Sequence, residues 1–245
     1  MTPTATEKPV RLDRLLANLG YGSRTEVVAA IRRGYVIVDG SVVRSESTKV
    51  VPDPTRVLFN REPIDDPSTI VIALHKPVGS TCSHDDREAP LVYDLLPPRW
   101  QLRNPRVEAV GRLDRDTSGL LLLTDDHQLL HRLSSPKHHV AKRYVAMLDV
   151  APPNDLAARF GSGELLLERE ATPCLPALVE VISERTIVVT LTEGRYHQVR
   201  RMFASVGCHV EALVRESVGA LTIAELGLAP GEYCRVEPAQ LTTAG

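Results

Sequence analysis

The sequence predicts an α+β fold in two parts, a small helix–helix–hairpin unit followed by a larger domain with a mixed, largely antiparallel sheet. Residues 11–50 carry the pattern of two short helices and a hairpin, and a polar, proline-bearing stretch follows them. Beyond it, strand and helix patterns succeed one another without the regular βαβ alternation of a parallel sheet. We therefore expect a loose tail at 1–10, a small domain at 11–65 and a large domain at 66–245.

The composition is that of a globular protein. Of 245 residues, 43% are hydrophobic and 24% are charged, which excludes a disordered chain, collagen and a disulfide-framework miniprotein. No apolar run approaches the ~20 residues of a membrane span, and Met1–Pro9 lacks the apolar stretch of a secretory signal. The four cysteines stand singly, with no CxxC pair. They suit a reducing, cytoplasmic setting.

The small unit begins with an apolar stripe. Leu12, Leu15, Leu16 and Leu19 recur at i, i+3, i+4 and i+7, which indicates a short amphipathic helix. Ser23-Arg24-Thr25-Glu26 is a capping box that starts a second helix, and Gly34 ends it. Asp39-Gly40, between two short apolar runs, indicates a tight hairpin turn. Five arginines outside the apolar stripes are free to face solvent or phosphate: Arg11, Arg14, Arg24, Arg32 and Arg33.

The larger domain mixes short strands with short helices. Apolar runs predict strands at 70–74, 107–110, 120–124, 143–148, 178–182, 186–191 and 210–214. Helical patterns cover 126–133 and 196–206.

Charge is spread unevenly over a chain of net charge −2. Lys8–Lys49 holds eight basic and four acidic residues, and Arg99–Arg143 holds nine basic and five acidic. The overall balance argues against coating nucleic acid through bulk charge, but it allows binding through a local patch. On charge alone, a chance fluctuation on a solvated surface is an equally good interpretation.

Three polar segments stand out. Gly111–Gly119 sets two carboxylates and two guanidiniums between apolar strands, although its composition alone favours an ordinary surface loop. Glu193–Met202 opens a helix with two arginines, and on its own this segment favours an exposed basic helix end that binds nothing. In Ser134–Tyr144, the adjacent His138 and His139 cannot chelate one metal as an i,i+4 pair would, so we expect no metal site.

Together, the segments GRLDRDTSGLLLLTDD, SPKHHVAKRYVAML and EGRYHQVRRMFASVG resemble those of the bacterial pseudouridine synthases that modify small-subunit ribosomal RNA. Residues 11–50 resemble the small RNA-binding domain named after ribosomal protein S4. The resemblance spans roughly residues 10–242 in the same order, and the SPKHH and EGRYHQV segments favour the small-subunit branch. His75 and His127 depart from the family pattern, which bears on local loop shape.

The resemblance implies a role for each matching residue. Asp114 matches the catalytic aspartate, Tyr144 the tyrosine that packs on the uracil, and Arg200 the basic residue that pairs with the aspartate. Substrate contacts are expected from a further set: Arg112, Leu121, His197, Lys137, Lys142, Arg201 and the five arginines of the small unit. Asp116, as the second member of a glycosidase-like carboxylate pair, is a weaker alternative.

The implied reaction detaches uracil from C1′, turns the base and rejoins it through C5. No atom is added or lost, so no cofactor is expected, and Asp114 can begin the reaction as nucleophile or as base. The expected partner is ribosomal RNA or a partly assembled ribosomal subunit, with the protein a monomer away from membranes. The alternatives are a non-catalytic RNA-binding or ribosome-assembly factor, the same chemistry on large-subunit RNA, and a metal-dependent nucleic-acid hydrolase.

Overall fold

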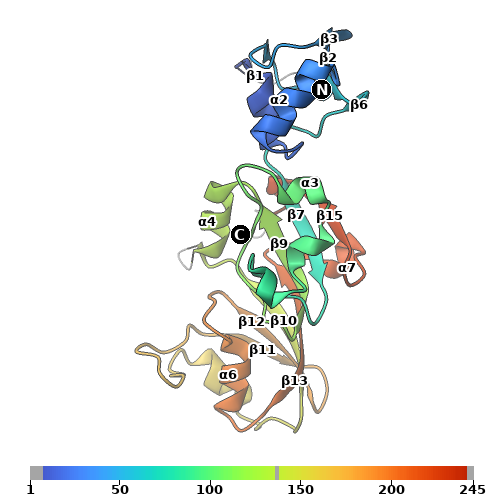
Figure 1. Ribbon diagram of the computed structural model, residues 1–245. Coiled ribbons are helices and arrows are strands. Elements are labelled where there is room, and N and C mark those ends of the chain that lie inside the picture. The colour runs from blue at the N-terminus through green and yellow to red at the C-terminus, as the bar shows by residue number, and fades with distance from the viewer. Residues whose placement is uncertain (1–7, 136–137, 242–245) are drawn as a thin grey trace. The chain divides into compact units, whose positions relative to one another are not determined.

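The computed structural model describes residues 8–135 and 138–241 (Figure 1). Its contacts divide the chain into two compact units. The first consists of the chain up to Ile70 together with Leu96–Val107, and the second of Val71–Leu95 and the chain from Glu108 onward. None of the described helices has the length and apolar character needed to cross a membrane.

The first unit has the helix–helix–hairpin arrangement that its sequence predicts. Its elements are β1 (Val10–Arg11), α1 (Leu12–Asn18), α2 (Arg24–Arg33), β2 (Val36–Val38), β3 (Ser41–Val43), β4 (Lys49–Val50), β5 (Val57–Phe59) and β6 (Glu62–Pro63). The antiparallel sheet runs β3-β2-β5-β6, and β1 pairs with β4. All four leucines of the stripe are buried. Val10, which the sequence placed in a loose tail, is part of β1 and pairs with Val50; residues 1–7 of that tail lie outside the described residues.

Two local signals of this unit are confirmed. The Ser23 hydroxyl accepts from the Glu26 amide at 3.3 Å, and the Glu26 carboxylate accepts from the Ser23 amide at 2.7 Å. Both central residues of the hairpin turn, Asp39 and Gly40, have positive φ angles of 49° and 78°. That is the backbone of a two-residue turn whose twist matches the strands that it joins.

Leu96–Val107, which contains α3 (Pro98–Gln101), belongs with the first unit because of specific side-chain contacts. The Arg99 guanidinium forms an ion pair with Asp65 at 2.9 Å and lies 4.6 Å from the centre of the Tyr21 ring. The Trp100 indole donates to the same carboxylate at 3.3 Å. These partners are far apart in the sequence, so periodicity gives no sign of the association.

The second unit is built on one nine-stranded sheet. Its main path is β11 (Leu178–Val181), β12 (Thr186–Leu191), β10 (Lys142–Leu148), β13 (Val210–Val218), β9 (Thr117–Thr124), β7 (Val71–Lys76) and β15 (Tyr233–Arg235). In addition, β14 (Leu221–Thr222) pairs with β13, and β8 (Glu108–Ala109) pairs with β9. The pairing of β9 with β13 is parallel and the others are antiparallel. The expected mixed, largely antiparallel sheet is therefore confirmed.

Short helices pack on this sheet in two apolar clusters. One cluster takes side chains from α5 (Leu156–Gly161) and α6 (Gln198–Ala204), and the other from α4 (His127–Ser134) and α7 (Ile223–Leu226). Helix α6 begins two residues later than the sequence predicts. The reason is that His197, its N-terminal flanking residue, has a left-handed backbone with a φ of 49°.

Gly119 lets β9 approach β13 closely. It lies opposite Arg215 in the parallel register and has a φ of +120°. A Cβ atom at this position would lie 2.3 Å from the Arg215 carbonyl oxygen, which no side chain can do. The close approach brings the start of β9, and the loop before it, against the middle of β13.

Candidate active site

A cavity of about 440 Å³ opens in the second unit. Its lining comes from the loop between β8 and β9, from β10 and β13, and from the turn that precedes α6. Six residues expected to act on the substrate are among those that line it: Arg112, Asp114, Lys142, Tyr144, His197 and Arg200. The fold thus gathers the three polar segments of the sequence around one space.

The buried side chain of Lys76 holds the loop that carries Asp114 in place. This side chain is completely buried at the end of β7, and its ammonium donates to the carbonyl oxygens of Pro77, Arg115 and Thr117 at 2.8–3.3 Å. Burial lowers the pKa of the Lys76 ammonium. The Gly79 amide also donates to the Arg115 carbonyl at 2.8 Å, which further holds the loop. The loop is therefore a rigid support for its aspartate.

The carboxylate of Asp114 is 31% exposed and faces His197, whose Nε2 lies 3.3 Å from Oδ1. The His197 ring stacks on Tyr196 with 3.9 Å between ring centres and an angle of 16°. Tyr196 is 70% exposed. The sequence predicts a substrate contact for His197, and the structure places its ring against the aspartate.

Arg200 does not form the expected ion pair with Asp114. Its guanidinium donates instead to the carbonyl oxygens of Val210 at 2.8 Å and Asp116 at 3.1 Å. Among the residues that the structure describes, no carboxylate lies within 4 Å of it. Nη1 and Nη2 thus each bind a main-chain acceptor, so Arg200 ties the Asp114 loop to β13 rather than pairing with the carboxylate.

Two candidates on β10 lie side by side on one face of the strand. Tyr144 and Lys142 both line the cavity, as residues two apart in a strand do when they share a face. The Lys142 ammonium donates to the Val140 carbonyl at 3.0 Å. Burial lowers the pKa of Lys142, and the nearby charge of Arg215 lowers it further.

Other candidates lie elsewhere. Leu121 is completely buried and does not line the cavity. The cavity reaches β9 only at its first residue, Thr117, and Leu121 is four residues further along, about 13 Å in a strand. Lys137 lies outside the described residues.

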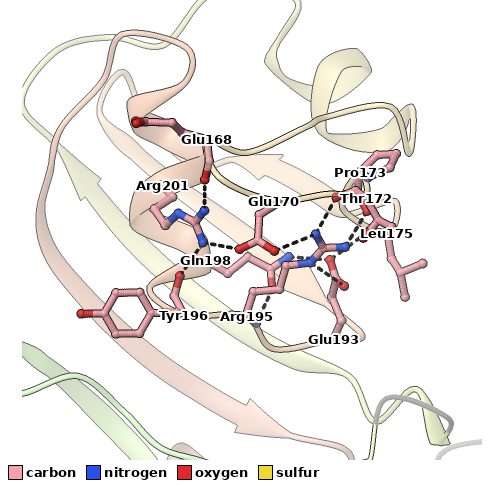
Figure 2. Close-up of polar contacts among 10 residues, drawn as sticks. All are labelled: Glu168, Glu170, Thr172, Pro173, Leu175, Glu193, Arg195, Tyr196, Gln198 and Arg201. Carbon is pink, nitrogen blue, oxygen red and sulfur yellow. Dashed lines mark hydrogen bonds and ion pairs between the residues drawn. The ribbon is translucent and has the colours of Figure 1, made fainter.

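Arg201 is taken up by a network that shapes the turn before α6 (Figure 2). Its guanidinium binds the Glu170 carboxylate at 2.7 Å, and Arg195 approaches the same carboxylate at 3.6 Å. Arg195 and Gln198 also bind the buried Glu193 at 3.1 and 2.6 Å. This network fixes the turn that holds His197, so Arg201 supports the site without lining it.

The arginines expected to bind RNA from the first unit are all exposed. Arg11 and Arg24 pair with the buried Asp13 at 3.0 and 3.5 Å, and Arg32 pairs with Glu46 at 2.7 Å. Arg14 and Arg33 form no ion pair within the described part of the chain.

Sequence reasoning missed Lys76, Thr117 and Arg215 as parts of the site. Arg215 is 2% exposed in the middle of β13 and lines the cavity. The sequence contains one sign of such buried residues: Lys76 and Arg215 each lie inside or at the end of an apolar run. Such a residue is ordinarily interpreted as solvent-facing, and only the three-dimensional contacts show that it is buried.

Among the described residues, no group of three or more His, Cys, Asp or Glu side chains is placed to hold a metal ion.

Comparison with known proteins gives the family. The model of the RNA pseudouridylate synthase family matches residues 70–205, and that of the S4 domain matches residues 10–53. "Ribosomal small subunit pseudouridine synthase A" of Escherichia coli K12 is 41% identical over 227 residues, which are 91% of this chain and 95% of that protein. An uncharacterized RNA pseudouridine synthase of Bacillus subtilis is 40% identical over 228 residues, 91% of this chain and 93% of its own. A crystal structure of a pseudouridylate synthase matches with a TM-score of 0.65 at 34% identity, over 95% of this chain and 98% of that one. The chain therefore belongs to the RNA pseudouridylate synthase family, and an S4 domain precedes its synthase region.

Proposed function

We propose that this protein isomerises a specific uridine of small-subunit ribosomal RNA to pseudouridine, with Asp114 as the catalytic carboxylate. The observation that carries the proposal is the position of Asp114, on a clamped loop at a cavity of about 440 Å³ that Tyr144 also lines. A cavity of this size suits a ligand as large as a nucleoside. The family supports the reaction, and the names of the similar proteins support the small-subunit substrate.

The side chains fit a nucleotide that has left its stack. Flipping a uridine out of paired RNA costs a few kcal/mol, and the ring of Tyr144 can compensate by packing on the base. Arg112 is exposed on the same loop, where it can meet the phosphate backbone. Asp114 then begins the reaction: the N1–C1′ bond breaks, the base turns and a C5–C1′ bond forms, while C5 loses a proton and N1 gains one, so that no atom is gained or lost overall. Arg200 acts as a positioning residue through its bond to the Asp116 carbonyl.

The first unit supplies RNA affinity in this proposal. Its S4 domain exposes arginines, and Arg14 and Arg33 are exposed without an ion pair in the described part of the chain. Phosphate oxygens are the natural partners of such groups. We propose that the protein works as a monomer in the cytoplasm, on ribosomal RNA or a partly assembled subunit.

The test is a map of pseudouridines in ribosomal RNA from cells with and without this protein. We expect one small-subunit position to lose its pseudouridine and to regain it when the wild-type chain is restored. The Asp114→Asn chain should not restore it. A lost position in large-subunit RNA would reassign the substrate. An unchanged map with defective subunit assembly would favour a non-catalytic assembly factor.

A further inference from the structure

Arg215 is a buried cation that the reaction as described leaves unused. It lies in the middle of β13, is 2% exposed and lines the cavity. Its Nε donates to the Leu120 carbonyl at 2.7 Å, and its Nη2 is buried without an acceptor in the part of the chain described. A buried donor left without a partner costs free energy, so its retention needs an explanation.

The charge of Arg215 is unpaired as well. No carboxylate of the described residues lies within 4 Å of it, and besides burial its charge helps to lower the pKa of two other cations, Lys142 and Lys76. Burying a charge without a counter-ion is strongly unfavourable. A cation kept in this state at the wall of a cavity is suited to an electron-rich ligand atom.

A second orphaned polar atom lies on the same face of the sheet. The Thr117 hydroxyl is buried, lines the cavity and has no partner among the described residues. Thr117 is opposite Leu213 in the parallel pairing of β9 with β13, and Leu213 alternates with Arg215 along β13. Opposed residues share a face, as do residues two apart, so Thr117 and Arg215 are diagonal neighbours that face the cavity.

The depth of these two groups selects the part of the nucleotide that they meet. Arg112 and Tyr196 are exposed, whereas Arg215 and Thr117 are 2% and 1% exposed. A flipped nucleotide stays joined to its RNA through two phosphates, so its base enters a cavity first and its phosphates remain at the entrance. The deep groups therefore face the base.

We propose that Arg215 is a uracil-binding residue whose Nη2 donates to a carbonyl oxygen of the flipped uridine, beside the hydroxyl of Thr117. This inference rests on the proposed function and identifies the part of the substrate that the deep wall of the site recognises. Uracil offers carbonyl oxygens at positions 2 and 4, on either side of its N3–H. Cytosine carries an amino group at position 4, so a contact at O4 would also exclude cytidine, because two donors would then face each other.

The experiment measures binding of uridine, 2-thiouridine, 4-thiouridine and ribose 5-phosphate to the full chain by ligand-observed NMR titration. Arg215→Gln should weaken uridine binding about 10- to 100-fold, the effect of one hydrogen bond to a charged group, and leave ribose 5-phosphate unchanged. Arg143→Gln is the matched control: it removes the same charge from the adjacent strand, where Arg143 pairs with Glu180 and Glu216. It should bind all four ligands as the wild type does.

Thr117→Val keeps the test decisive if Arg215→Gln folds poorly. The hydroxyl that it removes has no described partner, so the variant should unfold at an equal or higher temperature and yet bind uridine more weakly. Sulfur is a poorer hydrogen-bond acceptor than oxygen, so the analogue with sulfur at the contacted position should bind the wild type more weakly than uridine does. The same analogue should bind Arg215→Gln about as well as uridine does. Which of the two analogues behaves in this way identifies the contacted carbonyl.

Three results would overturn the inference: no uridine binding by the wild type, unchanged uridine affinity in both variants, or a loss confined to ribose 5-phosphate. The last result would assign Arg215 to phosphate. A further pair of results would separate the two proposals. If uridine binding depends on Arg215 but the pseudouridine map is unchanged in cells without the protein, the proposed function is contradicted, whereas the assignment of Arg215 to uracil binding stands.

Discussion

The carboxylate of Asp114 differs from its neighbour Asp116 by its surroundings. Asp114 lines the cavity and faces His197, whereas Asp116 is exposed and contributes its main-chain carbonyl to Arg200. Asp114→Asn keeps the shape of the side chain, so we expect pseudouridine formation to fall about 10⁴-fold or more with little change in folding or RNA affinity. Asp116→Asn is the control and should stay close to wild type. Both are measured by pseudouridine yield in ribosomal RNA, and a fast Asp114→Asn enzyme would refute the assignment.

Asp13 couples the stability of the first unit to acid. Its carboxylate is buried, and the hydrogen bond from Arg11 holds its pKa below the usual range despite the opposing effect of burial. A lowered folded-state pKa stabilises the fold above the unfolded value, near pH 4, and this contribution is lost as the pH falls through the folded value.

Asp13→Asn should therefore lower the unfolding temperature at pH 7, and its difference from the wild type should begin to shrink as the pH falls below about 4. Thermal unfolding between pH 3 and pH 7, followed by circular dichroism, measures this. A gap that stays constant over the range would show that ionisation of Asp13 contributes nothing.

Motifs placed Asp114, Tyr144 and His197 at one site, and the structure brings all three to the cavity. The sequence could not place Arg200, because its acceptors are main-chain carbonyls of residues 116 and 210, and carbonyls are the same in every residue. Arg215 was hidden for a related reason. A charged residue in a strand is expected to face solvent, and its burial depends on how closely β9 approaches.

At the scale of elements, that close approach depends on Gly119. Gly119→Ala puts a Cβ 2.3 Å from the Arg215 carbonyl in a backbone of positive φ, so we expect destabilisation of about 3 kcal/mol or more. Gly207→Ala is the control, since Gly207 also has a positive φ but meets nothing within 4 Å, and it should cost about 1–2 kcal/mol. Denaturant unfolding compares them; equal losses would show that the β9–β13 contact is not tight.

Elements with strong local signals were predictable, and those without were not. The leucine stripe of α1, the capping box of α2 and the positive-φ turn of the hairpin each specify their own structure. The short strands β14 and β15 exist because a neighbouring strand offers them hydrogen bonds, and two or three residues carry no periodicity of their own. Helix α6 starts later than its sequence pattern predicts because side chains around Glu193 fix the preceding turn.

For the whole molecule, we expect the first unit to set the salt dependence of RNA binding. Each phosphate contact releases counterions, so losing one should flatten the dependence of log affinity on log salt by about one unit. Arg14→Gln and Arg33→Gln should each do this. Arg56→Gln, whose arginine pairs with Asp39 at 2.7 Å, is the matched control and should change the slope less. Affinities of the full chain at several salt concentrations provide the measurement, and four equal slopes would mean that these arginines only face solvent.

The association of Leu96–Val107 with the first unit determines when that unit can be completed during translation. The chain leaves the ribosome from its N-terminal end, so Tyr21 and Asp65 emerge before Arg99 and Trp100, their partners in α3. At about 5–20 residues per second, the small unit waits some seconds for this segment. By then β7, the first strand of the larger sheet, has already emerged. Both units are therefore incomplete on the nascent chain at the same time, and the smaller is completed only after the first strand of the larger has emerged.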